Sequence, residues 1–175
     1  MSTTTYDYPT TLNDAGMAFK NRVQNPNMFR AYMLAKQTTL GVTGAYLDVI
    51  ELDHVRLILP SSFTTKDLFG RTSTAALLGA AEMCSAAALM LQLRNQRSTY
   101  RPKLKSLQFN VLDDAPDHEL MSFETESAEA HALFVAQATE ERPDELTQDL
   151  KVLGRNQHGE LSHEITLTWS LSQPE

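Results

Sequence analysis

The sequence predicts an α+β domain in which a curved antiparallel sheet wraps around one long central helix. The main observation is the stretch from Thr72 to Leu93, which is apolar, small or neutral apart from one charge, Glu82. A helix through this stretch has no fully polar face and is expected to be buried on all sides. Segments with two-residue alternation precede and follow it, as in antiparallel strands packed on one apolar helix.

Length and composition limit the class of protein. A chain of 175 residues fits one domain, and we expect an N-terminal arm over residues 1–24 followed by a single domain over 25–175. The net charge of −7 argues against a general affinity for nucleic acid or an anionic membrane. One cysteine, Cys84, rules out a disulfide framework, and the first residues lack the pattern of a signal peptide, so we expect a cytoplasmic protein.

Three elements are expected before the central helix. Asn25-Pro26 is typical of an N-cap followed by proline at the first helical position, and Gly41 of a helix end, which predicts a partly buried surface helix. Residues 42–60 then alternate with a period of two around a polar break at 51–54, which predicts a hairpin ending at Pro60. Residues 61–70 are expected to form the loop that leads to the central helix.

Strands dominate the rest of the chain. The expected elements are strands at 105–112 and 120–125 joined by a turn at 113–117, a short helix at 127–141, and a hairpin with strands at 146–155 and 161–171. The last strand is half-buried, because apolar residues and His163 alternate with polar ones up to Leu171.

A membrane-spanning helix is the alternative for the apolar segment. Residues 75–93 are about as long as a bilayer crossing requires. An ionised Glu82 at mid-membrane would cost about 3 kcal/mol, and alanine is a weak substitute for leucine in lipid. The amphipathic strands that follow favour a buried core helix, so we expect no membrane span.

With these elements the chain resembles the hot-dog fold, and in particular the thioesterase-like branch of that superfamily, over roughly residues 29–171. Many small thioesterases of this superfamily carry Asn-x-x-Gly-x-x-His-Gly-Gly and a catalytic Asp or Glu twelve residues after the first Gly. Gly70 falls on that glycine and Glu82 on the acid, with Asp67 in place of Asn and Ser73-Thr74-Ala75 in place of His-Gly-Gly. The helical insert before the last two strands looks like that of a separate subgroup.

The resemblance implies a thioesterase that hydrolyses acyl-CoA at a dimer interface. Glu82 would act as general base on water or as nucleophile, and Asp67 is a second catalytic candidate whose alternative role is to cap the helix. A structural role for Glu82, capping buried backbone or pairing with an arginine across an interface, stays open. The residues implied in oxyanion or substrate binding are Gly70, Ser73, Thr74 and Ala75.

Helix geometry favours a homodimer, and pairs of dimers could form a tetramer. Free N–H groups at the start of the helix can bind an oxyanion, although the hydroxyls of Ser73 or Thr74 are an alternative. Ala75 and Glu82 are seven residues apart, roughly 10 Å along one helix, so one chain cannot easily bring both to one carbonyl. Two antiparallel central helices could do so.

A basic run without an acid, RNQRSTYRPKLK, follows the central helix. It could hold the phosphates of coenzyme A or of an acyl-carrier prosthetic group, or it could be a solvated face at a helix C-terminus. The candidate phosphate-binding residues are Arg94, Arg97, Arg101 and Lys103. The five histidines show no metal-ligand spacing, and no cofactor is expected beyond acyl-CoA as substrate.

Two other activities are alternatives to hydrolysis. A non-catalytic protein that binds acyl thioesters or lipid-like ligands would keep the pocket without the chemistry. A dehydratase of acyl thioesters needs a His paired with an acid, and no His lies near Glu82 in the sequence. Cys84 is two positions from Glu82 and points away from it on a helix, which argues against a cysteine nucleophile.

Overall fold

The computed structural model describes residues 11–36, 38–112, 120–126 and 145–173. The helices are α1 (Asp14–Gln24), α2 (Pro26–Lys36), α3 (Thr38–Gly41), a short 3-10 helix η1 (Phe63–Thr65) and α4 (Thr74–Asn95). The strands are β1 (Tyr46–Ile50), β2 (His54–Pro60), β3 (Arg101–Val111), β4 (Leu120–Glu126), β5 (Glu145–Arg155) and β6 (Leu161–Ser172). The expected turn at 113–117 and helix at 127–141 lie outside the described residues.

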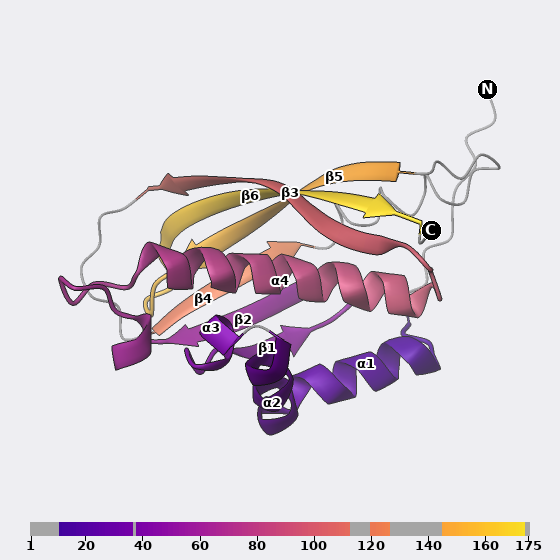
Figure 1. The fold of residues 1–175 in the computed structure, drawn as a ribbon, viewed down its shortest axis with the longest axis horizontal. Coiled ribbons are helices and arrows are strands. Elements are labelled where there is room, and N and C mark those ends of the chain that lie inside the picture. Colours follow the sequence, from indigo (N-terminus) through magenta and orange to yellow (C-terminus); the bar gives the residue numbers. More distant parts are fainter. Residues whose placement is uncertain (1–10, 37, 113–119, 127–144, 174–175) are drawn as a thin grey trace.

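The six strands form one antiparallel sheet in the order β1-β2-β4-β5-β6-β3. Figure 1 shows α4 lying along the curved sheet, with α1 and α2 beside β1. The predicted α+β arrangement, an antiparallel sheet packed on a long central helix, is confirmed. The two predicted hairpins are present as β1–β2 and β5–β6, and the surface helix predicted from Asn25-Pro26 to Gly41 is present as α2 and α3.

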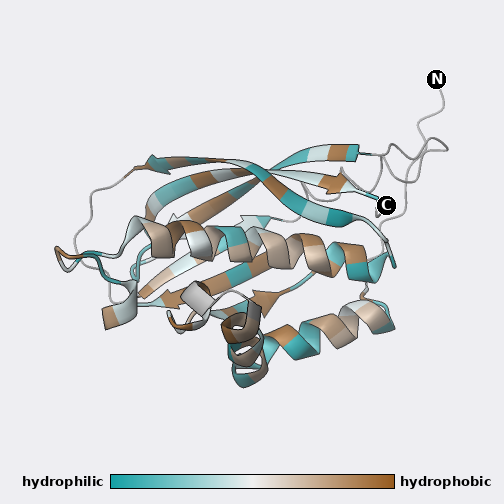
Figure 2. Cartoon of the chain, viewed as in Figure 1, coloured by the Kyte–Doolittle hydropathy of each residue, from teal (hydrophilic) through white to brown (hydrophobic). Residues whose placement is uncertain are grey.

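The core lies between α4 and the concave side of the sheet. Large side chains from the strands, such as Leu57, Phe123 and Leu167, are fully buried there. Small residues on α4, among them Ala80 and Ala81, are also fully buried and leave room for the strands to approach closely. Figure 2 shows α4 as mostly pale and brown, in line with its lack of a polar face. Although α4 is long and apolar enough to cross a membrane, it is the core helix of this domain.

One stripe of α4 is not buried, which corrects the expectation of burial on all sides. Glu82, Met83, Ala86 and Met90 are only partly buried, and Arg94 is exposed. Glu82, Ala86, Met90 and Arg94 are four residues apart and Met83 is next to Glu82, so they share one face of the helix. The sheet covers the opposite side of α4, and the N-terminal helices cover the remaining side only in part.

Residues 14–24 form a packed helix, α1, where the sequence pattern predicts an arm. The Asn13 side chain caps α1 by accepting a hydrogen bond from Gly16 N–H at 2.9 Å. Asn13 also donates its backbone N–H to Asn95 Oδ1 at 2.7 Å and its side-chain amide to the Asn95 carbonyl. Gly16 permits this approach, because a Cβ there would lie 2.8 Å from Asn95 Oδ1. Two hydrogen bonds thus attach α1 to the C-terminal end of α4.

Asn95→Ala is therefore expected to loosen α1 without unfolding α4. The substitution leaves the partly buried Asn13 N–H without its acceptor, which costs about 1 kcal/mol of unfolding free energy. Thermal unfolding should show this loss, and hydrogen exchange should rise over residues 14–24. Asn21→Ala, on the exposed part of α1, is the matched control. Equal exchange in the two variants would contradict this role of Asn95.

Candidate functional site

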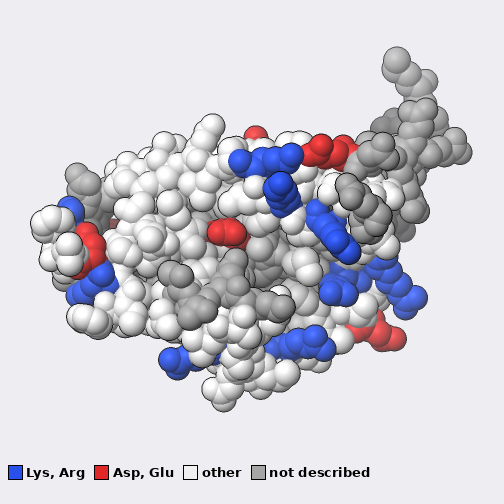
Figure 3. Space-filling model, viewed as in Figure 1, with Lys and Arg blue, Asp and Glu red and all other residues white. Residues whose placement is uncertain are grey.

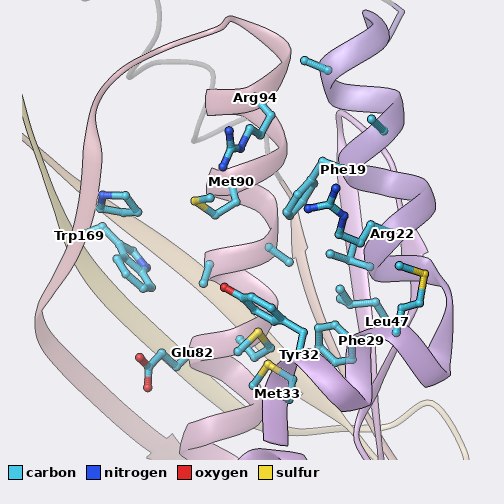
Figure 4. Close-up of a pocket in the computed structure, with 18 of the residues that line it drawn as sticks. Phe19, Arg22, Phe29, Tyr32, Met33, Leu47, Glu82, Met90, Arg94 and Trp169 are labelled. Atoms are coloured by element: carbon cyan, nitrogen blue, oxygen red, sulfur yellow. The ribbon is translucent and has the colours of Figure 1, made fainter. Parts of the chain in front are cut away.

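A pocket of about 800 Å³ lies between α4 and the pair α1–α2, and residues of β1, β3 and β6 complete its wall. Figure 4 shows side chains from α1, α2 and α4 facing one another across it. Its wall is predominantly apolar, and its larger apolar residues include Phe19, Val23, Phe29, Met33, Met83 and Met90. The pocket exists because the uncovered stripe of α4 faces the two N-terminal helices across a gap.

Glu82 is the acid of this pocket. It lies midway along α4, and the structure gives its carboxylate no hydrogen bond or ion pair with any described residue. Partial burial removes water from the carboxylate and raises its pKa above the ordinary value of 4.5. A half-buried carboxylate of this kind can take up a proton or attack an electrophile, because no described neighbour holds its lone pairs.

The backbone beneath Glu82 is fixed by a short hydrogen-bond chain. Trp169 of β6 donates its indole N–H to Ser85 Oγ at 3.2 Å, and Ser85 donates in turn to the Glu82 carbonyl at 3.0 Å. Ser85 is fully buried and Trp169 nearly so. This chain connects the sheet to the middle of α4 and holds Glu82 at the pocket wall.

The start of α4 offers two of the three predicted backbone donors. Ser73 is the N-cap, and its side chain accepts from Ala76 N–H at 3.2 Å. The N–H of Ser73 itself is donated to the Thr65 carbonyl at 2.8 Å, so it is not available as an oxyanion donor. The N–H groups of Thr74 and Ala75 have no acceptor within the part of the chain that the structure describes.

The Asp67 side chain binds backbone groups of the loop that precedes α4. Its Oδ1 accepts hydrogen bonds from Phe69 N–H at 2.8 Å and Arg71 N–H at 3.0 Å, and its other oxygen lies 3.8 Å from Arg71 Nε. Gly70 supplies the positive φ of +80° that this turn requires. Asp67 therefore stabilises the turn at residues 67–71. The N-cap of α4 is Ser73 and not Asp67. Neither Asp67 nor Gly70 lines the pocket of Glu82 within one chain.

The predicted basic residues separate into two groups. Arg94 lines the pocket. On β3, Pro102 and Leu104 line the pocket, so the alternating residues Arg101 and Lys103 point to the opposite face of the strand. Arg97 lies just beyond α4, is exposed and does not line the pocket. Figure 3 shows Lys and Arg side chains gathered where α4 ends and β3 runs.

Sequence reasoning missed two polar side chains of the pocket. Arg22 of α1 and Tyr32 of α2 line the pocket opposite α4. In Figure 4 the Tyr32 ring lies across the pocket with its hydroxyl turned toward α4. The Asn13 cap and the helical spacing of Phe19 and Val23 are the signals that could have predicted α1, and with it the position of Arg22.

Other reactive side chains are structural. Cys84 is fully buried, its pKa is raised by burial, and its Sγ donates to the Phe123 carbonyl at 3.2 Å. His163 is buried on β6, stacks on Phe109 with a ring separation of 5.4 Å, and hydrogen-bonds to Ser162 at 2.8 Å. Within the described residues no group of His, Cys, Asp and Glu is arranged to hold a metal ion.

Comparison by sequence finds no match, either among protein-family models or among curated proteins. Comparison by structure finds many. OLEI01261 from Chlorobaculum tepidum, a protein of unknown function, matches with a TM-score of 0.71 at 11% identity, over 87% of this chain and 99% of its own. PA5026 from Pseudomonas aeruginosa, a probable thioesterase, matches with a TM-score of 0.66 at 16% identity, over 87% of this chain and 99% of its own.

The thioesterase HI1161 from Haemophilus influenzae matches with a TM-score of 0.63 at 13% identity, over 85% of this chain and 91% of its own. The chain therefore has the hot-dog fold, as the sequence predicted, and the structures that it resembles over most of its length include thioesterases. At these identities the likeness establishes the fold, and the activity has to be argued from the site.

Glu82→Gln is expected to make the protein more stable at pH 7. Because burial raises the pKa of Glu82 in the folded state, the ionised side chain favours unfolding, whereas neutral glutamine does not. The gain in melting temperature should shrink as the pH falls through the raised pKa, and vanish below the 4.5 of a solvated glutamate. Thermal unfolding of both proteins from pH 4 to pH 8 measures this. A less stable Gln variant at pH 7 would show that the ionised carboxylate has a stabilising partner.

Proposed function

We propose that this protein is a thioesterase that hydrolyses acyl-CoA or a related acyl thioester, with Glu82 as its catalytic carboxylate. The observation that carries the proposal is a half-buried carboxylate without a partner among the described residues, at the wall of a mainly apolar pocket. The pocket can take an acyl chain, and the carboxylate can act on the thioester at its end. The hot-dog fold and its thioesterase examples support the same activity.

Glu82 can perform this reaction in two ways. As general base it takes a proton from water while the water oxygen attacks the thioester carbon, and the C–S bond breaks as the thiolate leaves and is protonated. As nucleophile it attacks that carbon itself, forms an anhydride with loss of the thiol, and is released by water. Both routes need the ionised carboxylate, so turnover falls as the pH drops through the raised pKa of Glu82.

The oxyanion donors are proposed to come from a second copy of the chain. Within one helix, Thr74 and Ala75 are seven or eight residues from Glu82, roughly 10 Å or more away. Their N–H groups, which have no acceptor among the described residues, lie at the positive end of the helix dipole and suit a developing oxyanion. An isologous dimer with antiparallel α4 helices brings them to the partner's Glu82 and forms two equivalent sites.

Exposed surfaces next to α4 support this dimer. β3 is a sheet edge of 11 residues, a length that soluble proteins usually cover or pair. In the loop before α4, Phe63, Leu68 and Phe69 are 96%, 100% and 81% exposed. Apolar side chains exposed to this degree are typical of a contact surface. A reducing cytoplasm, where acyl-CoA would be the substrate, is our proposed location.

A thiol-release assay on acyl-CoAs from short to long chains tests the activity. Turnover is expected on some chain lengths, and Glu82→Gln should lower kcat by at least about 100-fold, because the neutral amide can neither accept a proton nor attack. The Gln variant should still bind substrate. Substrate binding without turnover in the wild-type protein would instead favour the non-catalytic acyl-thioester binder.

Complementation between two variants tests the shared site. Thr74→Pro deletes a candidate donor N–H at the first helical position, where proline is tolerated and Ser73 already has extended backbone angles. It should lower kcat about 100-fold or more, whereas Thr74→Ala, which keeps the N–H, should be close to wild type. Mixing Thr74→Pro with Glu82→Gln subunits should restore about a quarter of wild-type activity, because half of the dimers are mixed and each has one intact site. No recovery after subunit exchange would contradict a site shared between chains.

A further inference from the structure

Two arginines that line the pocket have no partner among the residues that the structure describes. Arg22 on α1 and Arg94 near the end of α4 both line the pocket, and neither makes a hydrogen bond or ion pair with a described residue. Two other cations of the elements that line the pocket are paired: Lys20 of α1 lies 2.6 Å from Glu51, and Lys105 of β3 lies 3.0 Å from Glu145. Figure 4 shows the Arg22 side chain extending from α1 toward α4, with Arg94 nearby.

The wall between the arginines and Glu82 is apolar. Phe19, Met83 and Met90 lie along it, and the hydroxyl of Tyr32 is its main polar group. The indole N–H of Trp169 already donates to Ser85. An alkyl chain needs no hydrogen-bond partner there, whereas the amides of a pantetheine arm would lose their water partners without replacement. The wall therefore suits an alkyl chain better than the arm of coenzyme A.

We propose that Arg22 and Arg94 form a binding site for the anionic group of a single-chain amphiphile whose alkyl tail lies along α4 toward Glu82. The chemistry is that of a long-chain carboxylate. Guanidinium groups bind carboxylates through charge-assisted, often bidentate hydrogen bonds, and the apolar wall takes the tail. Arg94 and Glu82 are twelve residues apart on α4, roughly 18 Å, which leaves space for a medium to long chain between them.

This site gives the N-terminal helix a role in ligand binding. Asn13 and Asn95 hold the start of α1 against the end of α4, and α1 then runs beside the pocket, where the side chain of Arg22 extends toward α4 (Figure 4). The binding of a free carboxylate needs neither Glu82 as catalyst nor a second chain. The inference therefore goes beyond the proposed hydrolysis and does not depend on it.

Trp169 provides a direct readout, because it is the only tryptophan of the chain and lines the pocket. The intact protein is titrated at pH 8 with dodecanoate, with uncharged dodecanol and with coenzyme A, and Trp169 fluorescence is recorded. Dodecanoate should bind at least about tenfold more tightly than dodecanol. Arg22→Gln and Arg94→Gln should each weaken dodecanoate about tenfold and leave dodecanol unchanged. Arg101→Gln, on the opposite face of β3, is the matched control and should change neither.

Three results would overturn the inference. Equal affinities for dodecanoate and dodecanol would show that the arginines do not hold the anion. A response to coenzyme A that depends on Arg22 and Arg94, without one to dodecanoate, would make them a phosphate site. No response to any of the three compounds would exclude an amphiphile site. Because no thioester is present, these results are separate from the outcome of the hydrolysis assay.

Discussion

The structure depends on the need to bury a helix that has no polar face. The concave side of the sheet covers one side of α4, where Ala80, Ala81 and Cys84 are fully buried against the strands. A sheet cannot cover the other side of the same helix, so α1 and α3 pack against it and α2 faces it across the pocket. Their cover is incomplete, and the uncovered stripe of α4 becomes the wall of a pocket. The site is thus a consequence of how the core helix is covered.

Glu82 is the exception within this arrangement, since it places a carboxylate on an otherwise uncharged stretch of α4. Partial burial without a partner among the described residues raises its pKa and makes the ionised form unfavourable for stability. A neutral residue at position 82 would destabilise the folded state less than an ionised glutamate does. Residues that lower the stability of the fold in this way are typical of functional sites. Trp169 and Ser85 fix the backbone beneath Glu82, so the charge is held in a defined position.

The sequence predicts the fold well, because strand and helix periods are local signals. The two-residue alternation of β5 and β6, and the apolar run of α4, determine their structure within a few neighbours. The site depends on contacts that are distant in sequence. Asn13 reaches Asn95, 82 positions away, and so brings Arg22 to the pocket. Likewise, Ser73 donates its N–H to the Thr65 carbonyl and cannot donate it to an oxyanion, and no spacing rule predicts this hydrogen bond.

The central claim is that Glu82 is a carboxylate held in the pocket without a partner in the part of the chain that the structure describes. The direct measurement is a pH titration of its side-chain carboxyl by ¹³C NMR on protein labelled at glutamate carboxyls, with the signal assigned by its loss in Glu82→Gln. The account predicts a pKa above 4.5 in the free protein, because burial is the main influence on the group. A pKa at or below 4.5 would show a stabilising partner for the ionised form and contradict the proposed role.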